Sequence, residues 1–528
     1  MTPETLRQKL GEALKLQRVG KLDESDALIR DVIQFQPDHA GAHHLMGVSH
    51  MIRGDYDAAE ASMNKALDVN PRMADAVNNL GIVRQLQGRA DKAIECFRRA
   101  LELYPELSAS HSNVIFSLDH EPGVSDASAF AERRLWNERF ARKHHLAAPP
   151  CLNDRDPERV LRVGYVSGDY RNHSAAHTFM PVLFNHDPRA VELWCYSTVT
   201  RTDNVTDAFR KRAKVFRDVA AATPEQLAEQ VRVDRIDVLV DLSGHSEANR
   251  LPTFARRPAP VTVSAWGFAT ATGVDGVDYF FADPHSLPYE LHRFYAEKVV
   301  MLPVAIPYSL PSGMPAIEPL PSLAGAPFTF GCLNRLAKVT DPCLGLWARV
   351  LTAAPEARLL MKDRAFHSAQ VRLRVLDSFA ALGIDRERIE LLGPTPRIDH
   401  VKTYHRVDLA LDPIPAGGGM TMIEGLWMGV PSLSLIGQHI TGRLPSSLLV
   451  TAELGEFVFK TADDYVAAAV RWTGERARLA EIRAGMRERL KRAPYLDHIV
   501  YTRRVERAYR AMWRRWCAGL SPAPFVVG

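Results

Sequence analysis

The sequence predicts an α-helical repeat solenoid followed by two α/β lobes, each built on a parallel sheet. Three observations support this fold class. The first hundred residues repeat with a fixed period, short β-rich runs alternate with helical stretches from residue 160 onward, and a proline-rich interval divides that second region. A chain of 528 residues is also too long for one hydrophobic core, so several domains are expected.

The N-terminal region repeats every 34 residues. The recurring positions are glycines and prolines: Gly20, Gly54 and Gly88, and Pro37, Pro71 and Pro105. A 34-residue unit with glycine in its turn and proline at its end resembles the tetratricopeptide repeat. Each helix pair of such an array buries its apolar side only against the next pair, so a solenoid is expected. We expect the repeats at residues 1–120 and a helical linker at 121–157, where AAPPCLNDRDPERV marks a domain boundary.

The remaining chain reads as two sets of short strands. The first set is LRVGYVS, VELWCYS, IDVLVDLSG, VTVSAWG and VDYFFAD; the second is FTFGCLN, RLLMK, RIELLG, VDLALDP and VPSLSLIG. Strands that alternate with helices imply parallel sheets joined by right-handed crossovers. Residues 303–327 are rich in proline and separate the sets, so we expect an N-terminal lobe at 158–318 and a C-terminal lobe at 325–517. Ligands of such sheets bind at the carboxyl ends of the strands.

One strand in the second set is joined to a helix by three successive glycines. The stretch is DPIPAGGGMTMIEGLWMGVP, residues 412–431. The turn leaves the first helix amides unpaired at the positive end of the helix dipole. Because glycine lets a backbone approach an anion closely, the turn is predicted to cradle a diphosphate; a merely tight loop is the alternative.

Composition excludes several classes of protein. Hydrophobic residues at 46% and charged residues at 24% are typical of a globular protein, and the net charge of +4 argues against a dedicated nucleic-acid binder. The six cysteines are scattered without a CxxC pair, so neither a disulfide framework nor a zinc site is expected. The sequence has no secretory leader and no apolar run of membrane-spanning length, so a cytoplasmic location without membrane contact is expected.

Polar clusters follow several predicted strands. The first lobe carries Asp169, Asn172, His173 and His177 after one strand and Asp241, Ser243 and His245 after another; the second lobe carries Asn334, Arg335 and Lys338, with Arg397 and His400 one helical turn apart. Each cluster alone is a weak signal, because a histidine at a strand end is more often a satisfied polar residue than a catalyst. Their combination is more specific.

Together these segments resemble the catalytic region of the O-GlcNAc transferase and SPINDLY-like family of glycosyltransferases. The matching elements are RVGYVSGDYRNHS, DLSGH, ARRPAPVTVSAWGFATATG, VDYFFAD, NRLAKVTDP, PRIDHVKTYHRVDLALDPIPAGGG and EGLWMGVPSLSL. They occur in the family's order over residues 160–437, downstream of tetratricopeptide repeats, which that family also carries. The resemblance implies a metal-independent, two-lobed GT-B fold. It also implies an inverting enzyme that moves N-acetylglucosamine from UDP-GlcNAc to serine or threonine hydroxyls of proteins.

The resemblance assigns the donor mainly to the second lobe. The glycine turn would face the diphosphate of the UDP-sugar, and side chains of two helices would hold the nucleoside. The residues concerned are Gly418, Gly419, Met420 and Thr421 for the diphosphate, Glu424 for the ribose, and Arg397 and His400 beside the uracil. No metal and no separate cofactor are expected.

Three residues are expected to act on the reaction itself. Lys338 would neutralise the leaving diphosphate, whose charge grows as the glycosidic bond breaks. His173 matches the family's active-site histidine, which either removes the acceptor proton or orients the reacting groups. Asp234, before the strand IDVLVDLSG, is a second candidate for electrostatic or proton-transfer help.

Two departures from the family pattern concern the sugar pocket. Met420 stands where a threonine is common, and WGFATATG replaces the pattern WxGYPGTTG. Alternatives therefore stay open: the same fold with GDP-fucose or UDP-glucose as donor or with another acceptor, or a non-catalytic repeat scaffold that binds nucleotide. The repeats are expected to recruit protein acceptors; the alternative is that they only cap the enzyme or make it a homo-oligomer.

Overall fold

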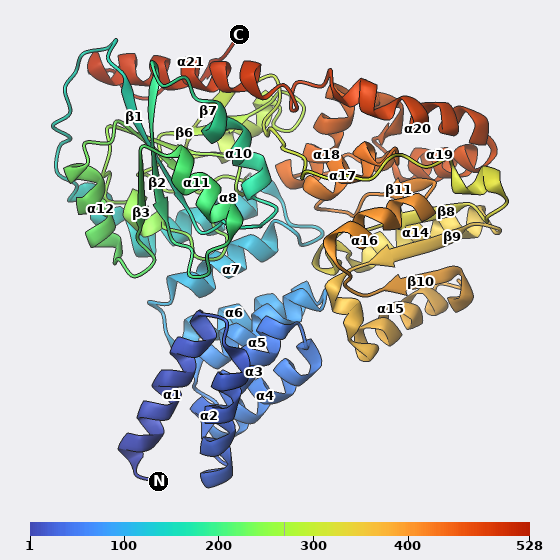
Figure 1. Cartoon of the computed structure of the whole chain (residues 1–528), viewed down its shortest axis with the longest axis horizontal. Helices are drawn as coiled ribbons and strands as arrows, with labels where there is room; N and C mark the ends of the chain where they lie inside the picture. Colours follow the sequence, from blue (N-terminus) through green and yellow to red (C-terminus); the bar gives the residue numbers. More distant parts are fainter. Residues whose placement is uncertain (269) are drawn as a thin grey trace. The chain divides into compact units, whose positions relative to one another are not determined.

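The computed structural model describes residues 1–268 and 270–528, so the segment WGFATATG contains one position, Ala269, outside the described residues (Figure 1). The chain divides into two compact units. Unit 1 comprises residues 1–122 and 332–396, and unit 2 comprises residues 123–331 and 397–528.

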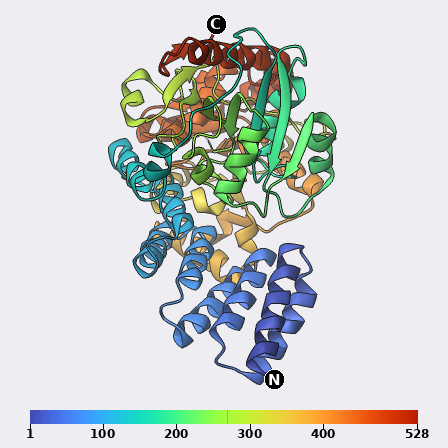
Figure 2. The same cartoon turned by 90° about the vertical axis from the view of Figure 1, so that its left-hand side faces the viewer.

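The 34-residue repeat of the sequence forms successive helix pairs in unit 1, which Figure 2 shows in blue. The helices are α1 (Pro3–Arg18), α2 (Leu22–Phe35), α3 (Ala40–Arg53), α4 (Tyr56–Val69), α5 (Ala74–Leu86), α6 (Ala90–Leu103) and α7 (Ser108–Leu118). The repeat glycines Gly20, Gly54 and Gly88 end their helices with φ values of 83°, 85° and 78°, a conformation that favours glycine.

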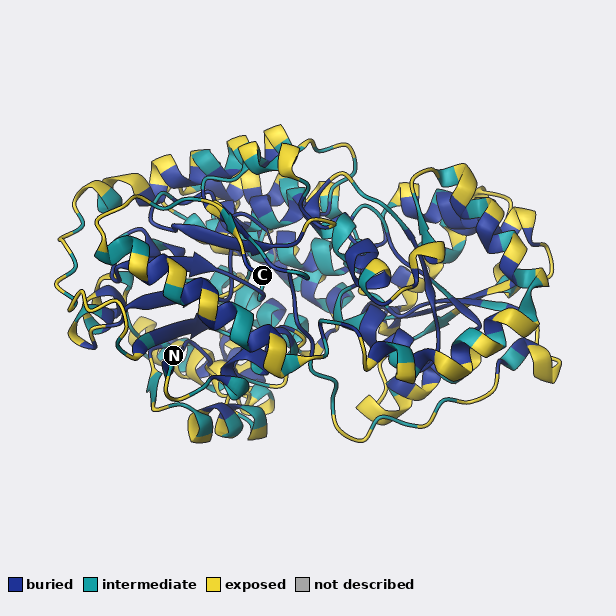
Figure 3. Ribbon diagram, turned by 90° about the horizontal axis from the view of Figure 1, so that it is seen from above, coloured by how far each residue is buried: buried dark blue, intermediate teal, exposed yellow. Residues whose placement is uncertain are grey.

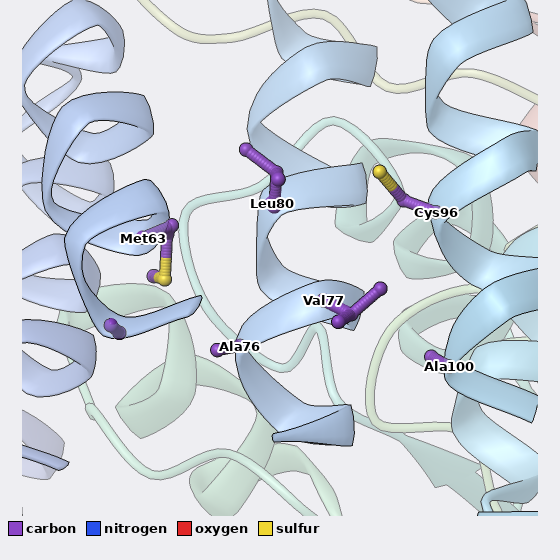
Figure 4. Packing of buried hydrophobic residues seen from close by; sticks show 7 residues of the cluster. Met63, Ala76, Val77, Leu80, Cys96 and Ala100 are labelled. Carbon is purple, nitrogen blue, oxygen red and sulfur yellow. The ribbon is translucent and has the colours of Figure 1, made fainter. Parts of the chain in front are cut away.

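Small residues let neighbouring repeat helices pack closely. A Cβ on Gly81 would lie 2.6 Å from the ring of Phe97, so this helix crossing requires glycine. One buried cluster joins three helices across the repeats (Figure 4). Its members are Met63, Ala66, Ala76, Val77, Leu80, Cys96 and Ala100. The predicted solenoid is thereby confirmed at the level of its packing.

The second part of unit 1 contains α14 (Asp341–Ala353), β9 (Arg358–Lys362), α15 (Ala369–Ala381) and β10 (Ile389–Leu392). It is bound directly to the repeat turns. Arg364 donates to the Ile52 carbonyl at 3.0 Å, Arg374 donates to the Gln87 carbonyl, and the Ser368 hydroxyl donates to Asp57. The sequence did not predict this attachment, which fixes the repeats to a segment of the catalytic region.

Unit 2 begins with a helical linker of α8 (Asp126–Trp136), η1 (Asn137–Ala141) and α9 (Arg142–Leu146). Arg134 pairs with Asp275 at 2.6 Å and Arg133 donates to the Ala271 carbonyl at 2.8 Å. These contacts bind the linker to loops of the first lobe.

The first lobe is built on an eight-stranded sheet with the order β14-β7-β6-β5-β4-β1-β2-β3. All its strand pairs are parallel. The strands are β1 (Leu161–Ser167), β2 (Val191–Ser197), β3 (Val215–Asp218), β4 (Val238–Asp241), β5 (Val261–Ser264), β6 (Tyr279–Ala282), β7 (Lys298–Met301) and β14 (Phe525–Val526). The helices between them are α10 (Ala176–Asn185), α11 (Asn204–Arg212), α12 (Pro224–Val233) and α13 (Leu251–Phe254). Central strands are buried along their whole length, as a parallel sheet covered on both faces requires (Figure 3).

The second lobe is built on a six-stranded sheet with the order β10-β9-β8-β11-β12-β13. The pairs β9–β10, β8–β11, β11–β12 and β12–β13 are parallel. Its further elements are β8 (Thr329–Cys332), β11 (Leu409–Leu411), β12 (Ser432–Leu435), β13 (Val458–Phe459), α16 (Arg397–Lys402), α17 (Met420–Trp427), α18 (Ile440–Thr451), α19 (Ala462–Gly474) and α20 (Arg476–Leu490). The prediction of two parallel-sheet lobes after a helical repeat region is confirmed.

The last helix differs from the sequence-based boundary, which assigned residues up to 517 to the second lobe. Helix α21 (His498–Cys517) packs instead on α10 of the first lobe. Glu506 of α21 contacts His186 at 3.0 Å, and Tyr509 contacts Tyr165 of β1 at 3.2 Å. Strand β14 then joins the edge of the first sheet, so the chain returns to its first lobe.

Candidate active site

His173 lies in the loop that follows the carboxyl end of β1. Its Nδ1 lies 3.1 Å from the Asp169 carboxylate, to which a protonated Nδ1 donates, and 3.3 Å from the Ala175 amide nitrogen. These two contacts orient the ring through Nδ1, which makes Nε2 the nitrogen that can meet a ligand. The side chain is 30% exposed, as a residue that acts on a substrate requires.

A second histidine, His177, lies in the first turn of α10 and contacts the segment between the lobes. His177 contacts the Ser309 hydroxyl through Nδ1 at 3.2 Å. Burial is the main cause that lowers the pKa of His177, and the charges of Arg397 and His173 lower it further. Unit 2 therefore brings the predicted residues His173 and Arg397 into the same electrostatic neighbourhood.

The predicted nucleoside residues lie on two helices, α16 and α17. Arg397 on α16 forms an ion pair with Glu424 on α17, and the Glu424 side chain is buried while that of Arg397 is half exposed. His400 lies one turn after Arg397 and is partly buried. The Tyr404 hydroxyl donates to the Thr421 carbonyl at 2.8 Å, which links α16 and its following turn η7 (Thr403–Arg406) to α17.

The glycine turn corrects one prediction. The Gly418 amide donates to the Asp412 carboxylate at 2.7 Å, and the Gly417 amide donates to the Thr441 carbonyl at 3.1 Å. These amides are therefore occupied within the protein and do not face a diphosphate. A Cβ on Gly417 would lie 2.3 Å from Asp412, so close approach of the protein's own groups explains this glycine.

The amino end of α17 leaves two backbone amides without a protein partner among the described residues. Gly419 precedes the helix without a side-chain cap, and the first helical hydrogen bond joins the Ile423 amide to the Gly419 carbonyl at 3.2 Å. Among the described residues, no acceptor pairs with the amides of Met420 and Thr421. Both residues are partly exposed, so two amides at the positive end of the dipole are available to an anion.

Asp234 does not lie with these residues. It caps the carboxyl end of α12, before β4, whereas His173 follows the carboxyl end of the parallel strand β1. Its buried carboxylate pairs with Arg217 at 2.5 Å and accepts the Tyr196 hydroxyl at 2.7 Å. Asp234 therefore lies at the opposite edge of the sheet with its charge compensated, and the predicted catalytic role gives way to a structural one.

The strand end at Asp241 is structural in the same way. The carboxylate is buried and accepts the Ser243 amide at 3.1 Å, the Gly244 amide at 2.9 Å and the Ser264 hydroxyl at 3.0 Å. Burial raises the pKa of Asp241 to about 6. His245 contacts the Thr272 carbonyl at 2.7 Å, so both residues stabilise loops beside the sheet.

Lys338 belongs to unit 1, in the short turn η4 (Leu336–Lys338). Its neighbour is a residue that sequence reasoning missed, His120 at the end of the repeats. His120 contacts the Phe116 carbonyl through Nδ1 at 2.8 Å. Burial, followed by the charge of Lys338, lowers the pKa of His120 to about 4, so this histidine is neutral beside the lysine. No local sequence motif marks His120. It is recognised only because the fold of unit 1 brings the end of the repeats close to the turn that carries Lys338.

Candidate metal ligands are sparse in this fold. Within residues 1–268 and 270–528, no three histidine, cysteine, aspartate or glutamate side chains gather in a metal-binding arrangement. Over the same residues, no helix is both long enough and apolar enough to cross a bilayer.

Comparison with known proteins agrees with this architecture. Residues 98–307 and 321–505 match glycosyl transferase family 41, and residues 38–106 match the tetratricopeptide repeat. A solved structure of a mutant O-GlcNAc transferase from Thermobaculum terrenum is 35% identical, with a TM-score of 0.93 over 98% of this chain and 100% of that one.

Curated plant proteins are also similar. The chain is 33% identical over 420 residues to the probable UDP-N-acetylglucosamine–peptide N-acetylglucosaminyltransferase SPINDLY of Solanum lycopersicum, covering 78% of this chain and 45% of that protein. It is 28% identical over 396 residues to the protein of the same description named SEC in Arabidopsis thaliana, covering 72% of this chain and 40% of that one. The chain thus spans less than half the length of these relatives. The two matched segments of the family cover most of the chain, and the chain belongs to glycosyl transferase family 41.

Proposed function

We propose that the protein is an inverting glycosyltransferase that moves N-acetylglucosamine from UDP-GlcNAc to serine or threonine hydroxyls of proteins. The observation that carries this proposal is that, within unit 2, Arg397 on α16 acts on a first-lobe histidine through its charge and pairs with an acidic residue of α17. Arg397 is electrostatically coupled to His177 and ion-paired with Glu424. Family membership and the names of the relatives support the reaction and the donor.

The donor is held by groups that the site presents for an anion and a nucleoside. The amides of Met420 and Thr421, with the Thr421 hydroxyl, bind the diphosphate at the amino end of α17. Glu424 accepts hydrogen bonds from the ribose hydroxyls, and Arg397 keeps its carboxylate paired. The His400 ring stacks on uracil. No metal is needed for these interactions.

Transfer is a single displacement at the anomeric carbon. The acceptor hydroxyl oxygen attacks that carbon, the bond to the diphosphate oxygen breaks, and UDP leaves with the bonding electrons. Lys338 stabilises the charge that grows on the diphosphate, a role that rests on the family resemblance and is stronger in the transition state than in the ground state. His173 Nε2 accepts the acceptor proton or orients the hydroxyl that loses it.

The donor assignment is tested by calorimetry without added divalent metal, and by donor hydrolysis across a panel of nucleotide sugars. UDP should bind much more tightly than GDP, and UDP-GlcNAc should be hydrolysed fastest. Equal or tighter binding of GDP would overturn the donor, and an absolute metal requirement would overturn the mechanism. Binding of UDP without turnover of any donor would favour the non-catalytic scaffold.

Two substitutions separate donor binding from chemistry. Lys338→Ala removes a cation from the diphosphate and should weaken both UDP binding and turnover. His173→Ala leaves the α17 amides intact, so it should mainly reduce turnover, by about 10²- to 10⁴-fold if the ring is a general base. Parental transfer by His173→Ala would remove its catalytic role.

The repeats are proposed to recruit the protein acceptor. Deleting residues 1–105 should spare UDP binding but weaken modification of proteins, while donor hydrolysis continues. The deletion also removes the carbonyl partners of Arg364 and Arg374, so the capping alternative predicts an insoluble protein instead. Undiminished protein modification by a folded truncation would overturn recruitment.

A further inference from the structure

The proline-rich segment between the lobes contributes one tyrosine to the interior of unit 2. The Tyr308 amide donates to the Tyr495 carbonyl at 2.9 Å, and its carbonyl contacts His498 Nε2 at 2.7 Å. The next amide, that of Ser309, donates to the His177 carbonyl at 2.8 Å. The main chain is therefore held from both lobes, and the Tyr308 ring packs edge-on against Tyr495 with centroids 6.3 Å apart. This packing gives the Tyr308 hydroxyl a defined position.

That hydroxyl points at Gly419, the residue that precedes α17. A Cβ built on Gly419 would lie 2.9 Å from the Tyr308 hydroxyl oxygen and 3.8 Å from the ring carbon that carries it. The ring therefore approaches Gly419 end-on, with the hydroxyl leading. Because such a Cβ would be closer than real Cβ atoms come, the phenol explains why glycine is required at this turn.

The hydroxyl has no protein partner although its side chain is almost fully buried. Tyr308 is 2% exposed, and none of the described residues forms a hydrogen bond with its hydroxyl group; unlike the Tyr495 hydroxyl, its oxygen is not among the fully buried atoms without a partner, so it keeps some accessible surface. A hydroxyl in a buried side chain has lost most of its water, so a hydrogen-bond partner on its accessible side is favourable. A group that is bound only during function would satisfy this hydroxyl.

The chemistry of that group follows from its other neighbours. The unpaired amides of Met420 and Thr421 lie at the same helix end, and they are donors only. A phenol hydroxyl beside them supplies a further donor, at the positive end of the helix dipole. Donors that converge from two elements select a ligand rich in acceptor oxygens and negative charge, as a diphosphate is.

We propose that the Tyr308 hydroxyl donates a hydrogen bond to a diphosphate oxygen of the sugar donor at the amino end of α17. This inference rests on the proposed function, which supplies the identity of the diphosphate-containing sugar donor. It adds a donor-binding residue that belongs to neither sheet. Since the Ser309 amide donates to the His177 carbonyl, the contact also links the diphosphate to α10, the helix that follows the His173 loop.

The test compares Tyr308→Phe with Tyr495→Phe by calorimetry, using UDP and uridine as ligands. A hydrogen bond to a charged group predicts about tenfold weaker UDP binding by Tyr308→Phe, with uridine binding unchanged. Tyr495→Phe is the matched control, because it removes a buried, unpartnered hydroxyl from the adjoining ring. It should bind both ligands as the parent does.

The outcomes separate this inference from the proposed function. If the parent binds GDP in place of UDP, the donor assignment fails, and the same comparison with GDP and guanosine decides the role of Tyr308. Parental UDP affinity in Tyr308→Phe would overturn the inference, as would an equal loss for uridine. A lower melting temperature of ligand-free Tyr308→Phe than of Tyr495→Phe would also overturn it, because the hydroxyl would then have a protein partner. A parent that binds no nucleoside diphosphate overturns both.

Discussion

The substitution Gly419→Ala tests the close approach of Tyr308 to α17 independently of any ligand. The added methyl contacts its neighbours, and any backbone effect of alanine at φ −103° and ψ −89° is the same whether or not the Tyr308 hydroxyl is present. Its nearest neighbour would be the Tyr308 hydroxyl oxygen at 2.9 Å. Either the phenol or the start of α17 must then move.

The magnitude follows from that contact. Overpacking a well-packed interior by one methyl group costs about 1–3 kcal/mol of unfolding free energy. In the Tyr308→Phe background the hydroxyl is gone, and the nearest ring carbon is at 3.8 Å, an ordinary van der Waals distance. The added methyl group should then be tolerated. Any effect of Gly419→Ala on the capping of α17 is the same with or without the Tyr308→Phe substitution, so it cancels from the coupling free energy. The coupling free energy of the double-mutant cycle should be about 1–2 kcal/mol.

Urea unfolding of the four ligand-free proteins, followed by circular dichroism and tryptophan fluorescence together, measures this cycle. Gly419→Ala should shift the transition to lower urea, and the double variant should return most of the way to Tyr308→Phe. If Gly419→Ala destabilises the protein equally in both backgrounds, the ring does not approach Gly419 end-on. The explanation of this glycine and of the unpartnered hydroxyl would then both fail.

Substitutions at three further residues test contacts within the protein. The pKa of His120 is about 4 in the folded protein, so its contribution to stability is present above pH 6.5 and falls by about 3 kcal/mol as the pH drops toward 4. His120→Gln should remove that part of the pH dependence of the unfolding free energy, measured by urea unfolding at a series of pH values. An unchanged dependence on pH would contradict this prediction. Arg483 donates to the carbonyls of Glu318, Val407 and Tyr404, and Arg483→Met should lower the free energy of unfolding by about 3 kcal/mol or more because it leaves them without this donor. Arg483→Lys should recover only part of this loss. A melting temperature of Arg483→Met equal to the parent's would show that these hydrogen bonds do not stabilise the protein. Tyr404→Phe loses the hydrogen bond to the Thr421 carbonyl and should cost about 1 kcal/mol, measured by the same unfolding assay; no loss would show that this bond is replaced by water.

Local sequence signals determined the fold class and placed candidate site residues on particular elements. The 34-residue period, the alternation of strands with helices and the glycine turn depend on short-range geometry, so they can be read without knowing any long-range contact. The family resemblance likewise named Arg397 and Glu424, which the structure joins in an ion pair. His173 was placed at a strand end, and it lies there.

Only the tertiary structure decided which polar groups are available to a ligand. Gly418 and Asp234 have the residue types that the predicted roles need, yet Asp412 occupies the Gly418 amide and Arg217 compensates Asp234. Tyr308 carries no motif, and its importance arises from packing against Gly419. The physical reason is the same in each case: a sequence shows which donors and acceptors a segment owns, whereas long-range packing decides which of them the protein itself has already paired.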